Sequence, residues 1–249
     1  MKVDDFFRRE YGPVAGVDEA GRGCIAGPVV AAAIILFEDL EGVNDSKLLS
    51  PKERERLYVE IREKAIVGVG IASAEEVDIH NVFNATKLAM ERAVKNLGLK
   101  PSFVIIDGKG ISLSVPSSCV VKGDRKSISI GAASIVAKVL RDEIMKEFSK
   151  FYPKFSFDRH KGYPTKEHLE EVRRYGILPL HRLSFQPILS WLTEETLERM
   201  FEKGLISKER FSRVLDLMKG SPSGGRKRVD LGQKGKTGCI SLFETLREG

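Results

Sequence analysis

Short apolar segments alternate along this chain with amphipathic segments that carry helix caps. Runs rich in Val, Ile and Ala predict five strands, over Val14–Asp18, Val29–Phe37, Ile66–Ser73, Phe103–Asp107 and Cys119–Val121. Helical periodicity and capping residues predict six helices, over Pro51–Lys64, Asn81–Leu97, Ile128–Lys150, Thr165–Tyr175, Thr193–Lys203 and Ser207–Lys219. The order of these segments predicts an α/β fold, in which a mixed sheet is flanked by helices and followed by a helical C-terminal subdomain.

The length of 249 residues leaves room for one large domain and a smaller addition. We predict a main domain over residues 1–190, a helical region over 191–219 and a flexible basic tail over 220–249, with a Gly-rich linker at Gly220–Gly238. The tail holds 6 Lys and Arg against 3 Asp and Glu, so half of the formal net charge of +6 lies in the last 30 residues. Such a segment suits loose contact with nucleic-acid phosphates.

Cysteine content and hydropathy indicate the cellular compartment in which the protein works. The 3 cysteines are far apart in the sequence, which predicts a reducing cytoplasm and no disulfide framework. The longest apolar stretch, Cys24–Phe37, is interrupted by Gly27 and Pro28 and falls short of the roughly 20 residues that a membrane span needs. Asn and Gln are scarce while Glu and Lys are abundant, which is typical of heat-adapted proteins. Nothing in the sequence requires more than a monomer.

Acidic residues end or follow three of the predicted strands. They are Asp18 with Glu19, Asp107 and Asp124. Apolar strands pair in the core of a sheet, so the acids at their ends can converge at one edge. Carboxylates that lie close together disfavour each other's ionisation, and a divalent cation with oxygen ligands relieves that repulsion. Two such ions about 3.5–4 Å apart would form a phosphodiester-cleaving site. The alternative is a set of solvated acids in turns, where Asp is common.

The acid pair raises a geometric question, because adjacent strand residues point to opposite faces. Asp18 and Glu19 can both face one site only if the strand ends or bulges there. Directly after them, Gly21-Arg22-Gly23 predicts a tight turn with exposed backbone groups. Such a turn can bind a ribose 2′-hydroxyl, the group that distinguishes RNA from DNA. The alternative is an ordinary turn with a solvated arginine.

The run Asp18-Glu19-Ala20-Gly21-Arg22-Gly23 resembles the opening motif of the ribonuclease HII family. The family's further motifs follow in order, and they are Asp45-Ser46-Lys47 with Leu49-Ser50, Ile106-Asp107-Gly108, Lys122-Gly123-Asp124, Ser134-Ile135-Val136-Ala137-Lys138 with Arg141-Asp142, and His160-Lys161-Gly162-Tyr163-Pro164-Thr165. The resemblance covers about Val14 to Arg182. The Gly-Arg-Gly turn matches type HII better than the lysine-containing turn of the related ribonuclease HIII.

The resemblance implies a ribonuclease H-like fold with 1–190 as the catalytic domain. It implies cleavage of RNA in RNA–DNA hybrids, and of a single ribonucleotide in duplex DNA, 5′ to the ribonucleotide, with two Mg²⁺ or Mn²⁺ ions. Its products would carry a 3′-hydroxyl and a 5′-phosphate. The same resemblance assigns metal binding and catalysis to Asp18, Glu19, Asp107 and Asp124, and substrate binding to Gly21, Arg22, Gly23, Lys47 and Tyr163. Tyr163 would stack on the sugar at the DNA side of the junction.

Three features lie outside these motifs or at their edge. Basic residues beyond the sheet could line the path of a duplex, and they are Arg159, Lys161, Lys166, Arg173 and Arg174. His160 is expected to order the loop that presents Tyr163, whereas His181 has no assignable role. The segment Cys239-Ile240-Ser241-Leu242-Phe243 resembles the short peptide that bacterial replication proteins dock into the DNA sliding clamp, although Cys239 replaces the usual Gln. The alternative is a segment folded back on the domain.

Two other functions remain open on the residues alone. One is a DNA-directed nuclease of the same fold, which would have no use for a turn that reads a 2′-hydroxyl. The other is a non-catalytic nucleic-acid-binding module whose acids only fix turns. Cleavage that depends on a divalent cation would exclude the binding module. Cleavage that requires a ribonucleotide in the substrate would exclude the DNA-directed nuclease.

Overall fold

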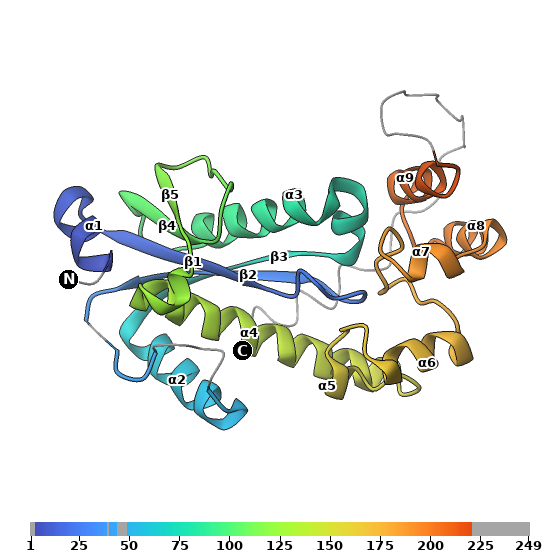
Figure 1. The fold of residues 1–249 in the computed structure, drawn as a ribbon, viewed down its shortest axis with the longest axis horizontal. Helices are drawn as coiled ribbons and strands as arrows, with labels where there is room; N and C mark the ends of the chain where they lie inside the picture. The colour runs from blue at the N-terminus through green and yellow to red at the C-terminus, as the bar shows by residue number, and fades with distance from the viewer. Residues whose placement is uncertain (1–2, 39, 44–48, 221–249) are drawn as a thin grey trace.

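The computed structural model describes residues 3–38, 40–43 and 49–220 (Figure 1). The predictions for Lys47 and for residues 221–249, including Cys239 to Phe243, therefore lie outside the described residues. Within them, no helix combines the length and the hydropathy needed to cross a bilayer.

The centre of the molecule is a sheet of five strands in the order β3-β2-β1-β4-β5. The strands are β1 (Val14–Ala20), β2 (Val29–Leu36), β3 (Ala65–Ala72), β4 (Phe103–Asp107) and β5 (Ser117–Val120). β2 is antiparallel to both β1 and β3, whereas β4 is parallel to both β1 and β5. The predicted mixed sheet is confirmed, and all of β2 is buried because helices cover both faces.

Helices pack on the two faces of this sheet (Figure 1). They are α2 (Pro51–Lys64), α3 (Ala74–Lys95) and α4 (Ile128–Phe151), and a short α1 (Val3–Tyr11) precedes the sheet. One face packs on α3 through small residues such as Ala85 and Ala89, and the other packs on α2 and α4. A Cβ on Gly16 of β1 would lie 2.3 Å from the Ser129 carbonyl carbon, so glycine lets α4 begin directly against the sheet.

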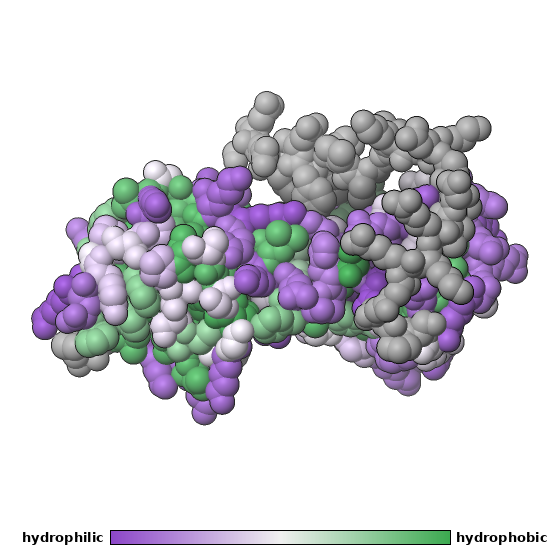
Figure 2. Space-filling model, turned by 90° about the horizontal axis from the view of Figure 1, so that it is seen from above, coloured by the Kyte–Doolittle hydropathy of each residue, from purple (hydrophilic) through white to green (hydrophobic). Residues whose placement is uncertain are grey.

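The remaining helices form the C-terminal region at one end of the sheet (Figure 1). They are α5 (Phe157–His160), α6 (Lys166–Tyr175), α7 (Ile188–Trp191), α8 (Glu194–Glu202) and α9 (Lys208–Met218). Their apolar faces build a core of their own, which includes Phe157, Leu197 and Val214 and continues to Ile25 and Met145. Hydrophilic residues cover the outer end of this region (Figure 2). The predicted helical C-terminal subdomain is thus present.

Several boundaries differ from the sequence predictions. The helix predicted from Asn81 instead begins at Ala74, because a capping box of Ser73 and Glu76 starts it seven residues earlier. Asn81 breaks this helix with a positive φ of 66°, and its side chain accepts hydrogen bonds from the N–H groups of Phe83 and Asn84. The segment predicted as strand up to Ser73 ends at Ala72 for the same reason.

The short helix α1 was not predicted from the sequence. Its Tyr11 ring stacks on Phe103 of β4 with 4.3 Å between ring centroids. Its buried Asp4 accepts hydrogen bonds from the N–H groups of Ile128 (2.9 Å) and Ser129 (3.1 Å), and so caps α4. Both stabilising contacts join segments that are remote in sequence, so local periodicity could not reveal them.

Candidate active site

Three predicted carboxylates meet at the end of β1. β1 pairs with β4 only as far as Val17 and Ile106, so Asp18 and Asp107 are the next residues on two neighbouring strands. Adjacent strand residues usually point to opposite faces, yet Asp18, Glu19 and Asp107 all line one pocket of about 450 Å³. Both members of the acid pair therefore reach this pocket although β1 continues to Ala20.

Asp124 lies in the adjoining pocket. It is buried in a short 3-10 helix, η1 (Gly123–Arg125), and shares a pocket of about 300 Å³ with Asp107. The Gly123 N–H donates to Asp107 Oδ1 at 2.7 Å, which ties η1 to the end of β4. Asp107 thus lines both pockets and connects the four predicted acids.

The acids perturb each other electrostatically. Burial, then the charge of Glu19, raises the pKa of Asp18 well above its ordinary value, and Asp107 adds to this shift. A hydrogen bond from Ser134 of α4 acts in the opposite direction. Burial also raises the pKa of Glu19, while Arg22, at 3.1 Å from its carboxylate, opposes the rise. A cation among these oxygens would relieve the repulsion between the carboxylates, which contributes to the raised pKa values.

Carboxylate oxygens are the ligands that suit Mg²⁺ and Mn²⁺. Three of the acids, however, have a local contact in this structure: Asp18 with the Glu19 N–H at 2.8 Å, Glu19 with Arg22, and Asp107 with Gly123. Across the part of the chain that the structure describes, no three His, Cys, Asp or Glu side chains converge closely enough to ligate one ion as they stand. Each of these contacts uses only part of a carboxylate's acceptor capacity and leaves lone pairs for a cation.

The Gly21–Gly23 turn borders the same pocket as the acids. Gly21 has a φ of 94°, and a Cβ there would lie 2.0 Å from Arg141 Nε and 2.7 Å from the Pro28 carbonyl oxygen. Only glycine fits this position, because both the backbone and the space exclude a side chain. Arg182 donates to the carbonyls of Gly21 and Arg22 at 2.7 Å each and so fixes the turn from behind.

Tyr163 lines the same pocket as this turn. The residue is 40% exposed, so part of it is accessible to a ligand. The Arg141 guanidinium lies 5.7 Å from the ring centroid, and burial raises the pKa of the Tyr163 hydroxyl, which contacts Cys24. The structure thus brings together seven predicted site residues around one pocket, and they are Asp18, Glu19, Asp107, Gly21, Arg22, Gly23 and Tyr163.

Sequence reasoning missed several residues that shape this pocket. Ser134 and Lys138 line it from α4, and Arg54 lines it from α2. The first two belong to a motif noted in the sequence, and their spacing of four residues on a helix was the available signal. Arg182 carried no local signal, because its acceptors are backbone carbonyls, which every residue has.

The five basic residues beyond the sheet have local contacts. Arg159 forms an ion pair with Glu167, and Lys166 lies 3.8 Å from Glu170. Arg173 lies over the Trp191 ring, and Arg174 over the Tyr175 ring. The duplex path predicted for this group stays a prediction.

Comparison with solved structures identifies the class first, as ribonuclease H-like nucleases. Ribonuclease H2 from Pyrococcus horikoshii superposes with a TM-score of 0.61 at 26% identity, over 71% of this chain and 95% of that one. The enzyme in the PCNA:RNase HII complex from Archaeoglobus fulgidus superposes with a TM-score of 0.57 at 28% identity, over 66% of this chain and 87% of that one. The predicted ribonuclease H-like fold is confirmed.

Sequence comparison then gives the family. The model of ribonuclease HII matches residues 15–188, and the ribonuclease HII of Thermotoga maritima is 63% identical over 98% of this chain and 100% of its own. This chain therefore belongs to the ribonuclease HII family, as its motifs predicted. It is an endonuclease of the type II ribonuclease H class, acting on RNA–DNA hybrids, and this family of enzymes depends on divalent metal ions.

Proposed function

We propose that this enzyme cuts duplex DNA 5′ to a single embedded ribonucleotide, at the RNA–DNA junction, and leaves a 3′-hydroxyl and a 5′-phosphate. The observation that carries the proposal is the composition of one pocket. Three carboxylates, a glycine turn and a half-exposed tyrosine line the same space of about 450 Å³. One nucleotide can therefore contact all three groups at once.

In this proposal Asp18, Glu19, Asp107 and Asp124 hold two divalent ions, Mg²⁺ or Mn²⁺. Bound ions would activate the attacking water and stabilise the leaving oxygen. The protein's part is to place the carboxylates: the ends of β1 and β4 carry three of them, and the Gly123 contact brings the fourth on η1. Because burial and mutual repulsion raise the pKa of Asp18, an ion gains affinity from replacing that repulsion by attraction.

The glycine turn and Tyr163 would select the substrate. Gly21, Arg22 and Gly23 offer backbone groups to the ribose 2′-hydroxyl, which DNA lacks. Tyr163 would stack on the sugar that follows on the DNA side, and Lys47 would contact a phosphate. Residues 1–190 form the proposed catalytic domain, and we propose a monomer because one chain supplies every site residue. A DNA-directed nuclease would gain nothing from this turn.

The test uses a DNA duplex with one ribonucleotide, incubated with Mg²⁺, Mn²⁺ or EDTA. We expect cleavage with either ion, none with EDTA, and products mapped to the 5′ side of the ribonucleotide. Asp107→Asn should lower kcat by at least 100-fold while the Kd for the duplex changes by less than threefold. An Asn oxygen can still accept from Gly123, so the fold should survive.

Asp216→Asn is the matched control, since Asp216 is exposed on α9, a helix outside the pocket. It should leave kcat unchanged. Undiminished activity of Asp107→Asn would remove this residue from the metal site. Equal cleavage of an all-DNA duplex would favour the DNA-directed nuclease, and metal-independent binding without cleavage would favour a binding module.

We also propose that the tail contacts a sliding clamp through Cys239, Ile240, Ser241, Leu242 and Phe243. These residues lie outside the described part of the chain. Support comes from the order of the apolar residues and from the Archaeoglobus fulgidus relative, which was solved in a complex with PCNA. Apolar anchors on a tether suit binding to a pocket.

A further inference from the structure

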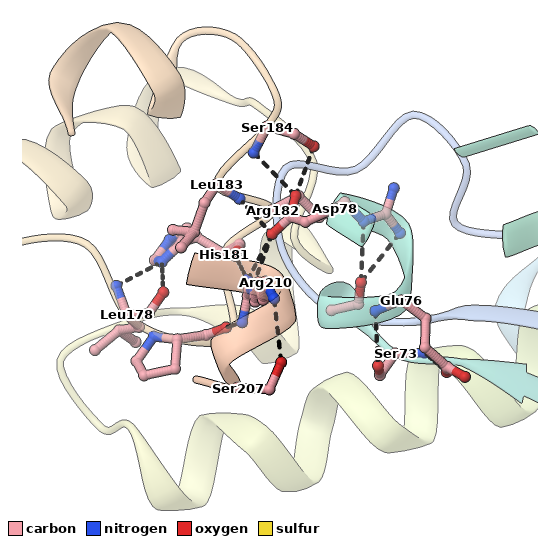
Figure 3. Close-up of polar contacts among 12 residues, drawn as sticks. Ser73, Glu76, Asp78, Leu178, His181, Arg182, Leu183, Ser184, Ser207 and Arg210 are labelled. Atoms are coloured by element: carbon pink, nitrogen blue, oxygen red, sulfur yellow. Dashed lines mark hydrogen bonds and ion pairs between the residues drawn. The ribbon is translucent and has the colours of Figure 1, made fainter. Parts of the chain in front are cut away.

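Two adjacent residues, His181 and Arg182, lie between the elements that we propose to read the ribonucleotide. Both are fully buried, in the segment that joins α6 to α7. Figure 3 shows this segment beside Asp78 of α3 and Arg210 of α9. The sequence assigned neither residue a role, and the metal site uses neither.

Arg182 fixes the glycine turn by its shape. Its Nη1 donates to the Arg22 carbonyl and its Nη2 to the Gly21 carbonyl, each at 2.7 Å. Nε and Nη2 also donate to the Gly27 carbonyl, at 3.1 and 3.0 Å. A planar guanidinium can satisfy three carbonyls on two sides of the turn at fixed angles, whereas a lysine ammonium is a single point. The turn therefore takes its position from Arg182.

His181 reaches Tyr163 through a second imidazole. His168 Nδ1 lies 2.9 Å from the Tyr163 carbonyl, which can only accept, so His168 carries its proton on Nδ1. His168 Nε2 must then accept, and His181 Nε2, at 3.1 Å, must donate to it. His181 Nδ1 is left to accept from the Leu178 N–H at 2.8 Å, while the Leu178 carbonyl lies farther away, at 3.3 Å. The contacts thus define one neutral tautomer for each ring.

The segment that carries both residues is itself held from two sides. Asp78 of α3 accepts hydrogen bonds from the N–H groups of Leu183 and Ser184, both at 2.9 Å. Arg210 of α9 pairs with Asp78 at 2.8 Å and donates to the His181 carbonyl at 2.7 Å (Figure 3). All of these groups are buried or nearly so, which makes the segment a rigid base for the turn and for Tyr163.

We propose that His181 and Arg182 are positioning residues that set the place of Tyr163 relative to the Gly21–Gly23 turn, and thereby the preference for an RNA–DNA junction. The inference rests on the proposed roles of that turn and of Tyr163. Arg182 acts on the turn directly, and His181 acts on Tyr163 through His168. Because the two residues are neighbours on one anchored segment, a nucleotide in the pocket meets both reading elements at a fixed separation.

The test compares two substrates of equal sequence: a duplex with one ribonucleotide and a continuous RNA–DNA hybrid. His181→Asn keeps an acceptor for the Leu178 N–H and loses the donor to His168. We expect kcat on the single-ribonucleotide duplex to fall at least 10-fold, and kcat on the hybrid to change less than threefold, because only the junction uses Tyr163. His181→Gln can place an amide donor near Nε2, so it should restore most of the preference.

Arg182→Lys should lower kcat on both substrates at least 10-fold, since both place a 2′-hydroxyl at the turn. Its KM should change less than threefold, because the phosphate contacts remain. Leu197→Ala, in the C-terminal core on α8, is the control for general destabilisation. It should lower Tm without changing the ratio of the two kcat values. Should His181→Asn fail to fold, His168→Leu breaks the same contact to Tyr163 and carries the same expectation.

An equal loss of kcat on both substrates in His181→Asn would show that His181 only supports the fold. A changed ratio of the two kcat values in Leu197→Ala would point the same way, because destabilisation alone would then alter the preference. Unchanged kcat in Arg182→Lys would overturn the role of Arg182. A wild-type enzyme that cuts the hybrid but not the embedded ribonucleotide would refute the proposed function and the role of His181 together. The effect of Arg182→Lys on kcat for the hybrid would still test the role of Arg182 at the turn.

Discussion

At the residue scale, the site depends on residues whose burial or backbone conformation is energetically unfavourable. Asp18 is buried beside Glu19 and Asp107, so its charged form is disfavoured unless a cation arrives. Gly21 has a conformation and a position that exclude any side chain. At Gly21 a side chain would meet the buried Arg141, so the close packing makes a substitution there destabilising.

Gly21→Ala tests this constraint. A Cβ would force Arg141 to move and would strain the backbone at φ of 94°, and strain of this kind costs about 1–3 kcal/mol. We expect a Tm lowered by several degrees and a kcat on ribonucleotide substrates lowered at least 10-fold. Gly23→Ala is the stability control in the same turn, since its Cβ would meet no atom within 4 Å and its Tm should stay unchanged. Equal Tm values for the two variants would contradict the packing argument.

At the element scale, three buried histidines join α5, α6 and the segment before α7. His160 and His168 stack at 4.0 Å between ring centroids, and His168 contacts His181. His160 accepts from the Gly162 N–H at 3.1 Å and contacts Glu171 at 3.0 Å, which agrees with the prediction that it orders the Tyr163 loop. All three rings are neutral in this arrangement, because each accepts a hydrogen bond.

This cluster predicts a dependence of stability on pH. Burial lowers the pKa of His168 to about 4 and that of His181 to about 3, below the ordinary value of 6.5. The unfolded chain therefore gains protons below about pH 6.5 that the folded protein refuses down to about pH 4 and 3. Stability falls as the pH decreases through that window, by about 1.4 kcal/mol per pH unit for each histidine.

The measurement is the free energy of unfolding from denaturant titrations between pH 4.5 and 6.5, for the wild type and for His181→Gln. Carboxylates add to both slopes and cancel in the comparison. The variant should have the shallower slope, by about 1.4 kcal/mol per pH unit. Identical slopes would mean that His181 is already charged in the folded protein.

At the scale of the whole molecule, the C-terminal region completes the pocket of the sheet domain. Arg182 spans 161 residues of sequence to reach Gly21, and Arg210 spans 132 to reach Asp78.

The basic tail follows this region, and its proposed partner is tested with the full chain. We expect saturable binding to a purified bacterial sliding clamp by fluorescence anisotropy, and its loss in L242A/F243A with hybrid cleavage unchanged. Equal binding by the variant would exclude this contact.

The sequence by itself determined which segments form strands, the order of these segments along the chain, and the acids at or shortly after their ends. These features depend on local periodicity and caps, such as the Ser50 and Glu53 capping box that begins α2 as predicted. The family's motifs added the candidate site, and the structure places seven of its residues around one pocket. The roles of those residues stay predictions until the variants are measured.

Only the tertiary structure decided how these parts are held. The contacts of Arg182 with the turn, of His181 with His168, and of Asp78 with Arg210 join segments that are distant or unpatterned in the sequence. Their acceptors are largely backbone carbonyls and neutral imidazole nitrogens. Since every residue carries a carbonyl, and since the proton on an imidazole is placed by its neighbours, no residue pattern can specify such contacts before the chain has folded.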